Sequence, residues 1–178
     1  TQQKLQDIGV SSTIKIIKTQ GDRIQHLSFD KMEGKGFFTK EIEDRLLSED
    51  IDLAVHSHKD LETTSPDGLT IAAVSYREDP RDVLLISKAH FSPDNGPLFV
   101  EDNAIIGTSS ARRKAQLHHL MPSLKMEDIR GNVPTRIDKL RQGNFHAIVL
   151  AAAGLQRLEI DTSEFESVYL NPEDFVPA

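Results

Sequence analysis

The residues from Ala104 to Arg136, AIIGTSSARRKAQLHHLMPSLKMEDIRGNVPTR, indicate the fold class most clearly, because they contain two strand–loop–helix units in succession. The segments Ala104–Gly107 and Lys125–Ile129 have strand length, and each is followed by a polar loop. Amphipathic segments with helical spacing follow these loops. The apolar stripe of the first segment consists of Leu117, Leu120, Met121 and Leu124. Such alternation is typical of α/β proteins with a largely parallel sheet.

The same alternation extends to both sides of this stretch. A helix is predicted over Phe38–Leu47, where Phe38, Ile42 and Leu46 recur every fourth residue. Thr1–Ile8 is helical in composition, with Gly9 as a C-terminal cap. The other predicted strands are Ile14–Lys18, Ile51–Val55, Thr70–Val74, Val83–Ile86 and Ala147–Ala151.

Two irregular stretches suggest two lobes with a cleft between them. Ser87–Asp102 has two prolines and no clear period, and it follows a possible boundary at Tyr76–Asp82. Asp161–Ala178 is also irregular and contains two prolines. Because an α/β lobe normally begins with a strand, we expect the chain to be a fragment that lacks an element at each end.

The composition excludes several classes of protein. The 178 residues carry a formal net charge of −7, whereas a general nucleic-acid binder needs a basic face. No run reaches the roughly 18 consecutive apolar residues that a membrane span needs. Without cysteine, the sequence offers no disulfide, thiolate zinc site or cysteine nucleophile. No secretion signal is visible, so we expect a cytoplasmic protein.

Polar loops follow three of the predicted strands. Ligands of open α/β sheets bind outside the carboxyl ends of the strands, so we expect these loops to lie on functional edges. The loops are His56–Asp60 after Ile51–Val55, Thr108–Arg113 after Ile105–Gly107, and Arg130–Arg136 after Lys125–Ile129.

The second and third loops carry groups that suit an anion. Helices that start there present free N–H groups, and guanidinium groups bind carboxylates or phosphates through two hydrogen bonds. The groups are the hydroxyls of Thr108, Ser109 and Ser110 and the guanidinium groups of Arg112, Arg113, Arg130 and Arg136. The alternatives are a serine that only caps a helix and arginines that are solvated surface charges. A pair of arginines in a first helical turn opposes the helix dipole, which favours a ligand beside them.

Two other loops hold single candidates. Asp60 is a candidate acid, base or cation-stabilising carboxylate, although Lys59 and Asp60 could equally form a surface ion pair. Lys35 could reach a bound anion, or its loop could only provide the entry to a helix.

Neither a metal site nor a nucleotide-binding motif is expected. His56 and His58 would share one strand face, His118 and His119 diverge on a helix, and no three-ligand spacing occurs. The dinucleotide, P-loop and nucleophile-elbow motifs are all missing from the sequence.

Six segments together closely resemble the hydroxymethylbilane synthase family, also called the porphobilinogen deaminase family. They occur in the family's order and cover nearly the whole chain, so their combination is specific although each alone is weak. The segments are Gly34–Glu41, Asp52–Asp60, Arg77–Asp82, Gly107–Arg113, Arg130–Arg136 and Leu150–Arg157.

The resemblance implies two type II periplasmic-binding-protein-like α/β lobes that face a cleft. Lobe one is expected at residues 1–78, lobe two at 79–170, and the start of a crossing back to lobe one at 171–178. The implied activity is that of a transferase of tetrapyrrole (haem) biosynthesis, which joins four porphobilinogens head to tail and releases ammonia at each step. A monomer that binds neither nucleic acid nor membrane is expected.

The resemblance also assigns roles to residues. Asp60 is expected to be the catalytic carboxylate that assists loss of ammonia and stabilises the cationic pyrrole. The residues expected to bind the substrate and cofactor are Lys35, Ser57, Lys59, Thr108, Ser109, Ser110, Arg112, Arg113, Arg130, Asn132, Arg136 and Gly154.

The family primes synthesis with a dipyrromethane cofactor on a cysteine of a third domain. That domain, its cysteine, the first strand of lobe one and the segment that re-enters it are absent from the sequence, so we expect this chain alone to be inactive. The rival interpretation is a non-catalytic two-lobed module that binds small carboxylates.

Overall fold

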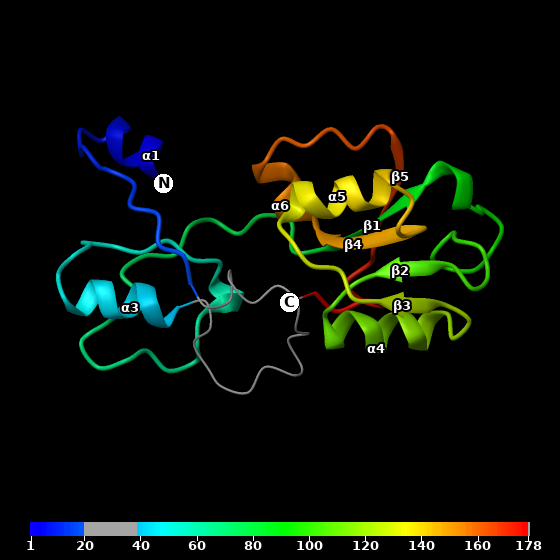
Figure 1. Ribbon diagram of the computed structural model, residues 1–178, viewed down its shortest axis with the longest axis horizontal. Helices are drawn as coiled ribbons and strands as arrows, with labels where there is room; N and C mark the ends of the chain where they lie inside the picture. The colour runs from blue at the N-terminus through cyan, green and yellow to red at the C-terminus, as the bar shows by residue number, and fades with distance from the viewer. Residues whose placement is uncertain (20–38, 178) are drawn as a thin grey trace. The chain divides into compact units, whose positions relative to one another are not determined.

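The computed structural model describes residues 1–19 and 39–177, and the chain divides into two compact units. The N-terminal unit contains the described residues up to Ser75, and the C-terminal unit contains those from Tyr76 onward (Figure 1). All strands assigned in the described residues belong to the C-terminal unit. No helix in the described ranges combines the length and the apolar character that crossing a bilayer demands.

The C-terminal unit is built on one mixed sheet of five strands in the order β3-β2-β4-β1-β5. β2 runs parallel to β3 and β4, whereas β1 runs antiparallel to β4 and β5. The strands are β1 (Asp82–Ser87), β2 (Ile105–Gly107), β3 (Lys125–Glu127), β4 (Ala147–Ala151) and β5 (Phe165–Tyr169). Because β1 is antiparallel, its first residue, Asp82, pairs with the last residue of β4, Ala151.

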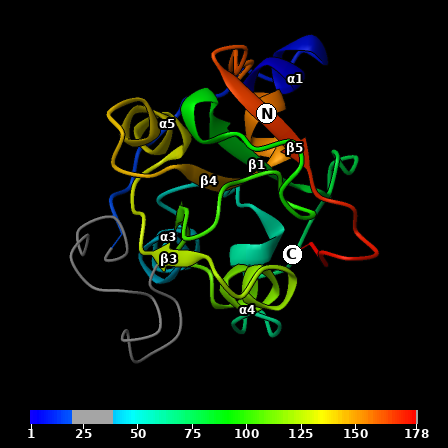
Figure 2. The same ribbon diagram turned by 90° about the vertical axis from the view of Figure 1, so that its right-hand side faces the viewer.

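Helices cover both faces of this sheet (Figures 1 and 2). They are α4 (Ala111–Leu120), α5 (Val133–Arg141) and α6 (Ala152–Arg157). Side chains alternate along β1, so Leu84 packs in a core cluster with Leu117 of α4. The next residue, Leu85, packs on the opposite face with Ile137 of α5 and Leu155 of α6. The sheet is therefore the middle layer of three.

The four strands predicted in this unit are confirmed, and their arrangement adds two corrections. Predicted segments 83–86, 104–107, 125–129 and 147–151 correspond to β1, β2, β3 and β4. The sheet is mixed rather than largely parallel, because β1 and β5 form antiparallel pairs. β5 was missed because Glu166, Ser167 and Tyr169 interrupt its apolar pattern, as is usual for a sheet edge that faces water.

The predicted helices also form, and their ends have local causes. The predicted helix whose apolar stripe runs to Leu124 ends at Leu120, since Met121 precedes Pro122 and takes an extended conformation with φ −149°. α5 begins after Asn132, whose side chain accepts a hydrogen bond from the backbone N–H of Thr135 at 3.0 Å. Pro134 occupies the first turn of α5, where no helical hydrogen-bond donor is needed.

The N-terminal unit differs from its prediction. Its elements are α1 (Gln2–Asp7), α3 (Lys40–Leu47) and the 3-10 turn η2 (His58–Asp60). The predicted strands 14–18, 51–55 and 70–74 are not strands in the structure. Ile16, Val55 and Val74 are exposed by 86%, 65% and 69%. Apolar character alone does not make a strand, because the backbone must also pair with a neighbour, and the described residues of this unit provide none.

The two segments predicted to be irregular contribute to the core of the C-terminal unit. Between β1 and β2, the turn η3 (Lys88–His90) is followed by a loop that Phe91 and Val100 close by pairing. Leu98 and Val100 of this loop are buried. At the other end of the unit, Phe175 is only 1% exposed and packs in the cluster that contains Leu117.

Candidate anion-binding site

The candidate site lies at the edge of the sheet where β2, β3 and β4 end. The chain leaves β2 and β3 through the loops 108–110 and 128–132, and α4 and α5 start directly after them. α6 follows β4 without a loop, and the antiparallel β1 begins at the same edge. Two of the three polar loops identified in the sequence thus lie at the carboxyl edge of this sheet, where they were expected.

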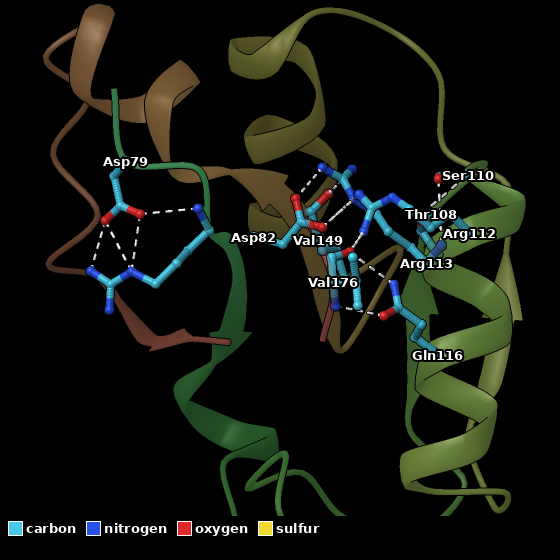
Figure 3. Close-up of polar contacts among 10 residues, drawn as sticks. Asp79, Asp82, Thr108, Ser110, Arg112, Arg113, Gln116, Val149 and Val176 are labelled. Carbon is cyan, nitrogen blue, oxygen red and sulfur yellow. Dashed lines mark hydrogen bonds and ion pairs between the residues drawn. The ribbon is translucent and has the colours of Figure 1, made fainter. Parts of the chain in front are cut away.

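Two arginines of α4 bind one buried carboxylate. Asp82 is 2% exposed and lies between Arg112 and Arg113 (Figure 3). Arg112 Nη2 donates to Asp82 Oδ2 at 2.7 Å. Arg113 donates to Oδ1 from Nη2 at 2.6 Å and to Oδ2 from Nε at 3.2 Å. The single charge of Asp82 neutralises only one of the two guanidinium groups, so this part of the site keeps a positive charge.

The side chains of the two arginines differ in their exposure to solvent. Arg113 is 8% exposed, and its Nη1 donates to the Val149 carbonyl of β4 at 3.1 Å. Arg112 is half-buried, donates to the Val176 carbonyl and lies 5.9 Å from the centre of the Phe175 ring. Arg113 is thus held rigidly by Asp82 and Val149, while Arg112 is the more accessible of the pair.

A second group of arginines surrounds the start of α5. Burial lowers the pKa of Arg136, and the positive charges of Arg113 and Arg130 lower it further. Arg136 Nε donates to the carbonyl of Gly131 at 2.8 Å, which directs the guanidinium toward the loop after β3. Arg113 and Arg130 therefore each lie close enough to Arg136 to repel it, and the three residues are here called the arginine cluster. A bound anion would relieve this repulsion.

Hydroxyl and amide side chains hold the two loops in shape. Ser109 Oγ donates to the carbonyl of Ile129 at 2.9 Å and accepts from the backbone N–H of the same residue at 3.0 Å. Ser110 caps α4, as the alternative interpretation of the sequence had it, and Thr108 Oγ1 accepts from the backbone N–H of Ser110 at 3.3 Å. Asn132 caps α5. These contacts give each residue a structural role, and its contact with a ligand stays a prediction.

The segment before β1 is fixed by its own ion pair. Arg81 donates to Asp79 from its backbone N, Nε and Nη2, the last at 2.7 Å (Figure 3). These hydrogen bonds lower the pKa of Asp79. The guanidinium of Arg81 also lies 4.7 Å from the centre of the Tyr169 ring of β5. Both contacts orient the chain where it enters β1, and they thereby position Asp82.

Gly154 lies in the first turn of α6, close to the start of α5. A Cβ atom added at Gly154 would lie 3.5 Å from Val133 Cγ2, an ordinary contact distance. The starts of α5 and α6 are therefore neighbours. This places Gly154 beside the loop that carries Arg130, and its contact with a ligand stays a prediction.

The other predicted residues belong to the N-terminal unit. Ser57 and Asp60 are exposed, and the backbone N–H of Asp60 donates to the Ser57 carbonyl at 2.9 Å. The prediction that the loop His56–Asp60 follows a strand is wrong, because residues 51–55 do not form a strand and Val55 is exposed. The backbone of Lys59 lies in η2, and Lys35 lies outside the described residues. Proximity of Asp60 to the arginine cluster stays a prediction.

Asp82 is the residue that the sequence analysis missed. It had been noted only as the last residue of a family-like segment, Arg77–Asp82. Its position directly before the apolar run VLLI was the available signal, since an acidic residue joined to a buried strand needs a cationic partner. The arginines of the next helix supply that partner.

Comparison with known proteins places the chain in one family. The family model described as "Porphobilinogen deaminase, dipyromethane cofactor binding domain" matches residues 1–178. A porphobilinogen deaminase of Clostridium novyi is 48% identical over 166 residues, which are 93% of this chain and 54% of that protein. One of Bacillus pumilus is 46% identical over 178 residues, 99% of this chain and 55% of that protein.

These relatives are longer than this chain. A porphobilinogen deaminase of Syntrophomonas wolfei is 49% identical over 165 residues, which cover 93% of this chain but 52% of the relative. The chain thus spans about half the length of the curated relatives that it matches. The match over all 178 residues and the identity to these relatives show that the chain belongs to the porphobilinogen deaminase family.

Proposed function

We propose that this chain is the substrate- and cofactor-binding part of a hydroxymethylbilane synthase, the transferase that joins four porphobilinogens head to tail and releases ammonia. The arginine cluster is the observation that carries this proposal. Arg113 and Arg130 lie near Arg136 at the carboxyl edge of the sheet, where burial and their positive charges lower the pKa of Arg136. Family membership supports the same activity.

The chemistry of the substrate suits this cluster. Each porphobilinogen brings two carboxylates, so the growing chain gains negative charge at every step. Carboxylates that bind Arg130 and Arg136 would accept charge-assisted hydrogen bonds and offset the repulsion among the guanidinium groups. Arg112 and the N-terminal N–H groups of α4 and α5 would hold further carboxylate oxygens.

The dipyrromethane cofactor fits the same donor set. Its carboxylate side chains match the guanidinium groups of the arginine cluster, while the 178 residues contain no cysteine that could attach it. When bound, the cofactor supplies the pyrrole end onto which the first substrate is joined. Arg113, held by Asp82 and Val149, would keep the positive charge of the site in a fixed place during each addition.

Asp60 is proposed as the catalytic carboxylate. A negative charge beside a pyrrole that becomes cationic as ammonia leaves would lower the barrier electrostatically. This role requires two α/β lobes, residues 1–78 and 79–170, that face each other in the type II periplasmic-binding-protein manner. The exposure of Asp60 in the N-terminal unit leaves its carboxylate accessible to a substrate.

The binding part of the proposal is tested by titrating the chain with porphobilinogen in a calorimeter. Arg136→Ala removes a charge-assisted contact and should weaken binding about tenfold or more. Arg141→Ala is the matched control on the same helix, because Arg141 is exposed and pairs with Asp138 and Glu164. Equal affinities of the two variants would contradict a carboxylate site at the arginine cluster.

A second substitution separates the enzyme from the rival, a non-catalytic carboxylate-binding module. In the full-length protein that carries this chain, Asp60→Asn keeps the side-chain size but removes the charge. If the protein is the enzyme, Asp60→Asn should lower the release of ammonia from porphobilinogen by about a hundredfold or more and leave binding nearly unchanged. If the protein is a module that only binds carboxylates, neither the unaltered protein nor the variant should release ammonia.

A further inference from the structure

Three potential metal ligands converge at the opposite edge of the sheet from the arginine cluster. His90 ends the turn η3 that follows β1, Glu101 lies in the loop before β2, and His146 directly precedes β4. β1 is antiparallel to β4, so the end of β1 and the start of β4 lie side by side. This group is therefore independent of the proposed porphobilinogen site.

The donor atoms of the three side chains are close together. Glu101 Oε1 lies 2.6 Å from His90 Nδ1 and 3.5 Å from His146 Nδ1. The two imidazole rings stack with centroids 3.8 Å apart and an interplanar angle of 7°. One potential ligand atom from each residue lies within 4.8 Å of the others. Tetrahedral zinc with bonds of 2.0–2.1 Å separates its ligands by about 3.3 Å, close to these distances.

The backbone holds the ligands in place. The backbone N–H of His146 donates to the Ile105 carbonyl, and the His146 carbonyl accepts from the N–H of Ser87, both at 2.9 Å. The pairing of Phe91 with Val100 closes the loop whose ends carry His90 and Glu101. The three ligands thus come from segments that the sheet and a closed loop bring to one place, and only the side chains need to move.

We propose that His90, Glu101 and His146 form a binding site for a divalent transition metal ion, with Zn²⁺ as the preferred ion. Two imidazole nitrogens and one carboxylate oxygen are a ligand set that zinc favours, and three protein ligands leave a fourth position for water. The side chains are 32%, 48% and 26% exposed, so an ion can reach them from solvent. The two ring planes are nearly parallel, so the lone pairs of the two rings do not converge on one point. One ring must therefore rotate about χ2 to bind the same ion as the other.

His146 already uses one ring nitrogen in a hydrogen bond. Its Nδ1 accepts from the backbone N–H of Ile105 at 3.3 Å, so the single lone pair of that nitrogen points to the N–H. To bind the ion, the ring gives up this long hydrogen bond or offers Nε2 instead.

The test is a titration of the protein with Zn²⁺ in a calorimeter and with Co²⁺ by visible absorption. We expect one ion per chain and the intense visible bands of tetrahedral cobalt. Glu101→Gln changes an exposed side chain with little change in size. It should weaken Zn²⁺ binding by at least the roughly 10- to 100-fold that loss of an outer-shell partner costs. His90→Ala and His146→Ala should weaken it further, and circular dichroism checks that each variant is folded.

The matched control is the double variant His118→Ala, His119→Ala. Both histidines are exposed on α4, so the control removes two histidines without touching the proposed site. It should bind Zn²⁺ as the unaltered chain does. The proposal fails if the unaltered chain binds no zinc with one-to-one stoichiometry, or if Glu101→Gln and the control lose equal affinity. The group is then only an ion pair of His90 with Glu101 beside a stacked ring.

Discussion

Asp82 shows how one side chain can set the charge and the geometry of a site. Removing a carboxylate from water costs several kcal/mol, and only close, well-directed partners offset that cost. Arg112 and Arg113 are such partners, with N–O distances of 2.7 Å and 2.6 Å. The two arginines would otherwise oppose the dipole of α4 in its first turn, so Asp82 stabilises them there.

Replacing Asp82 with asparagine tests this role. Asp82→Asn keeps the shape but leaves Arg113 buried without its counter-charge, which should lower the free energy of unfolding by about 3–5 kcal/mol. Urea denaturation measures the change. Asp138→Asn is the control, since Asp138 pairs with Arg141 at the surface and should contribute no more than about 0.5 kcal/mol. If Asp82→Asn lowers the free energy of unfolding by no more than Asp138→Asn does, the buried ion pair is not needed for stability.

At the scale of the element, the start of α5 depends on a backbone conformation that suits glycine. Gly131 has φ +111°, a region that side chains disfavour, and it directly precedes the capping residue Asn132. A Cβ atom at Gly131 would lie 2.7 Å from Thr135 Cγ2. The turn that brings Arg130 and Arg136 together therefore relies on the absence of a side chain at this position.

Alanine substitutions separate the backbone strain of a positive φ from the close contact with Thr135. Gly131→Ala adds both strain and a close contact, so it should lower the free energy of unfolding by about 2–4 kcal/mol. Gly143→Ala is the control, because Gly143 has φ +74° but no atom within 4 Å of the added Cβ. That control should lose only the backbone strain, about 1 kcal/mol. Thermal or urea unfolding compares them, and equal losses would mean that the contact with Thr135 relaxes freely.

At the scale of the whole molecule, the two units differ in what they bury. All the buried hydrophobic side chains among the described residues lie in the C-terminal unit, from Val83 to Phe175. The described part of the N-terminal unit buries only threonines and leaves Ile14, Ile16 and Val55 exposed. Since apolar burial is the main source of stability, the C-terminal unit should be much the more stable of the two.

Hydrogen exchange followed by mass spectrometry measures this difference. Amides of β1 and β4, which are paired within the sheet, should exchange only through global unfolding of the C-terminal unit. Amides of residues 14–17 and 52–55 should exchange close to the rate of an unfolded chain, because the structure gives them no strand partners. Protection of these segments equal to that of β4 would show that the N-terminal unit has a sheet of its own.

The α/β class, the helices α3, α4 and α5, the strands β1 to β4 and the polar loops 108–110 and 128–132 could all be predicted from the sequence. These follow from side-chain period, capping residues and charge, which act over a few neighbouring residues. Pairing and proximity were decided by the tertiary structure, because they depend on residues far apart in the chain. It left 14–18 without a strand partner, added β5, placed Asp82 between two arginines, and brought His90, Glu101 and His146 together.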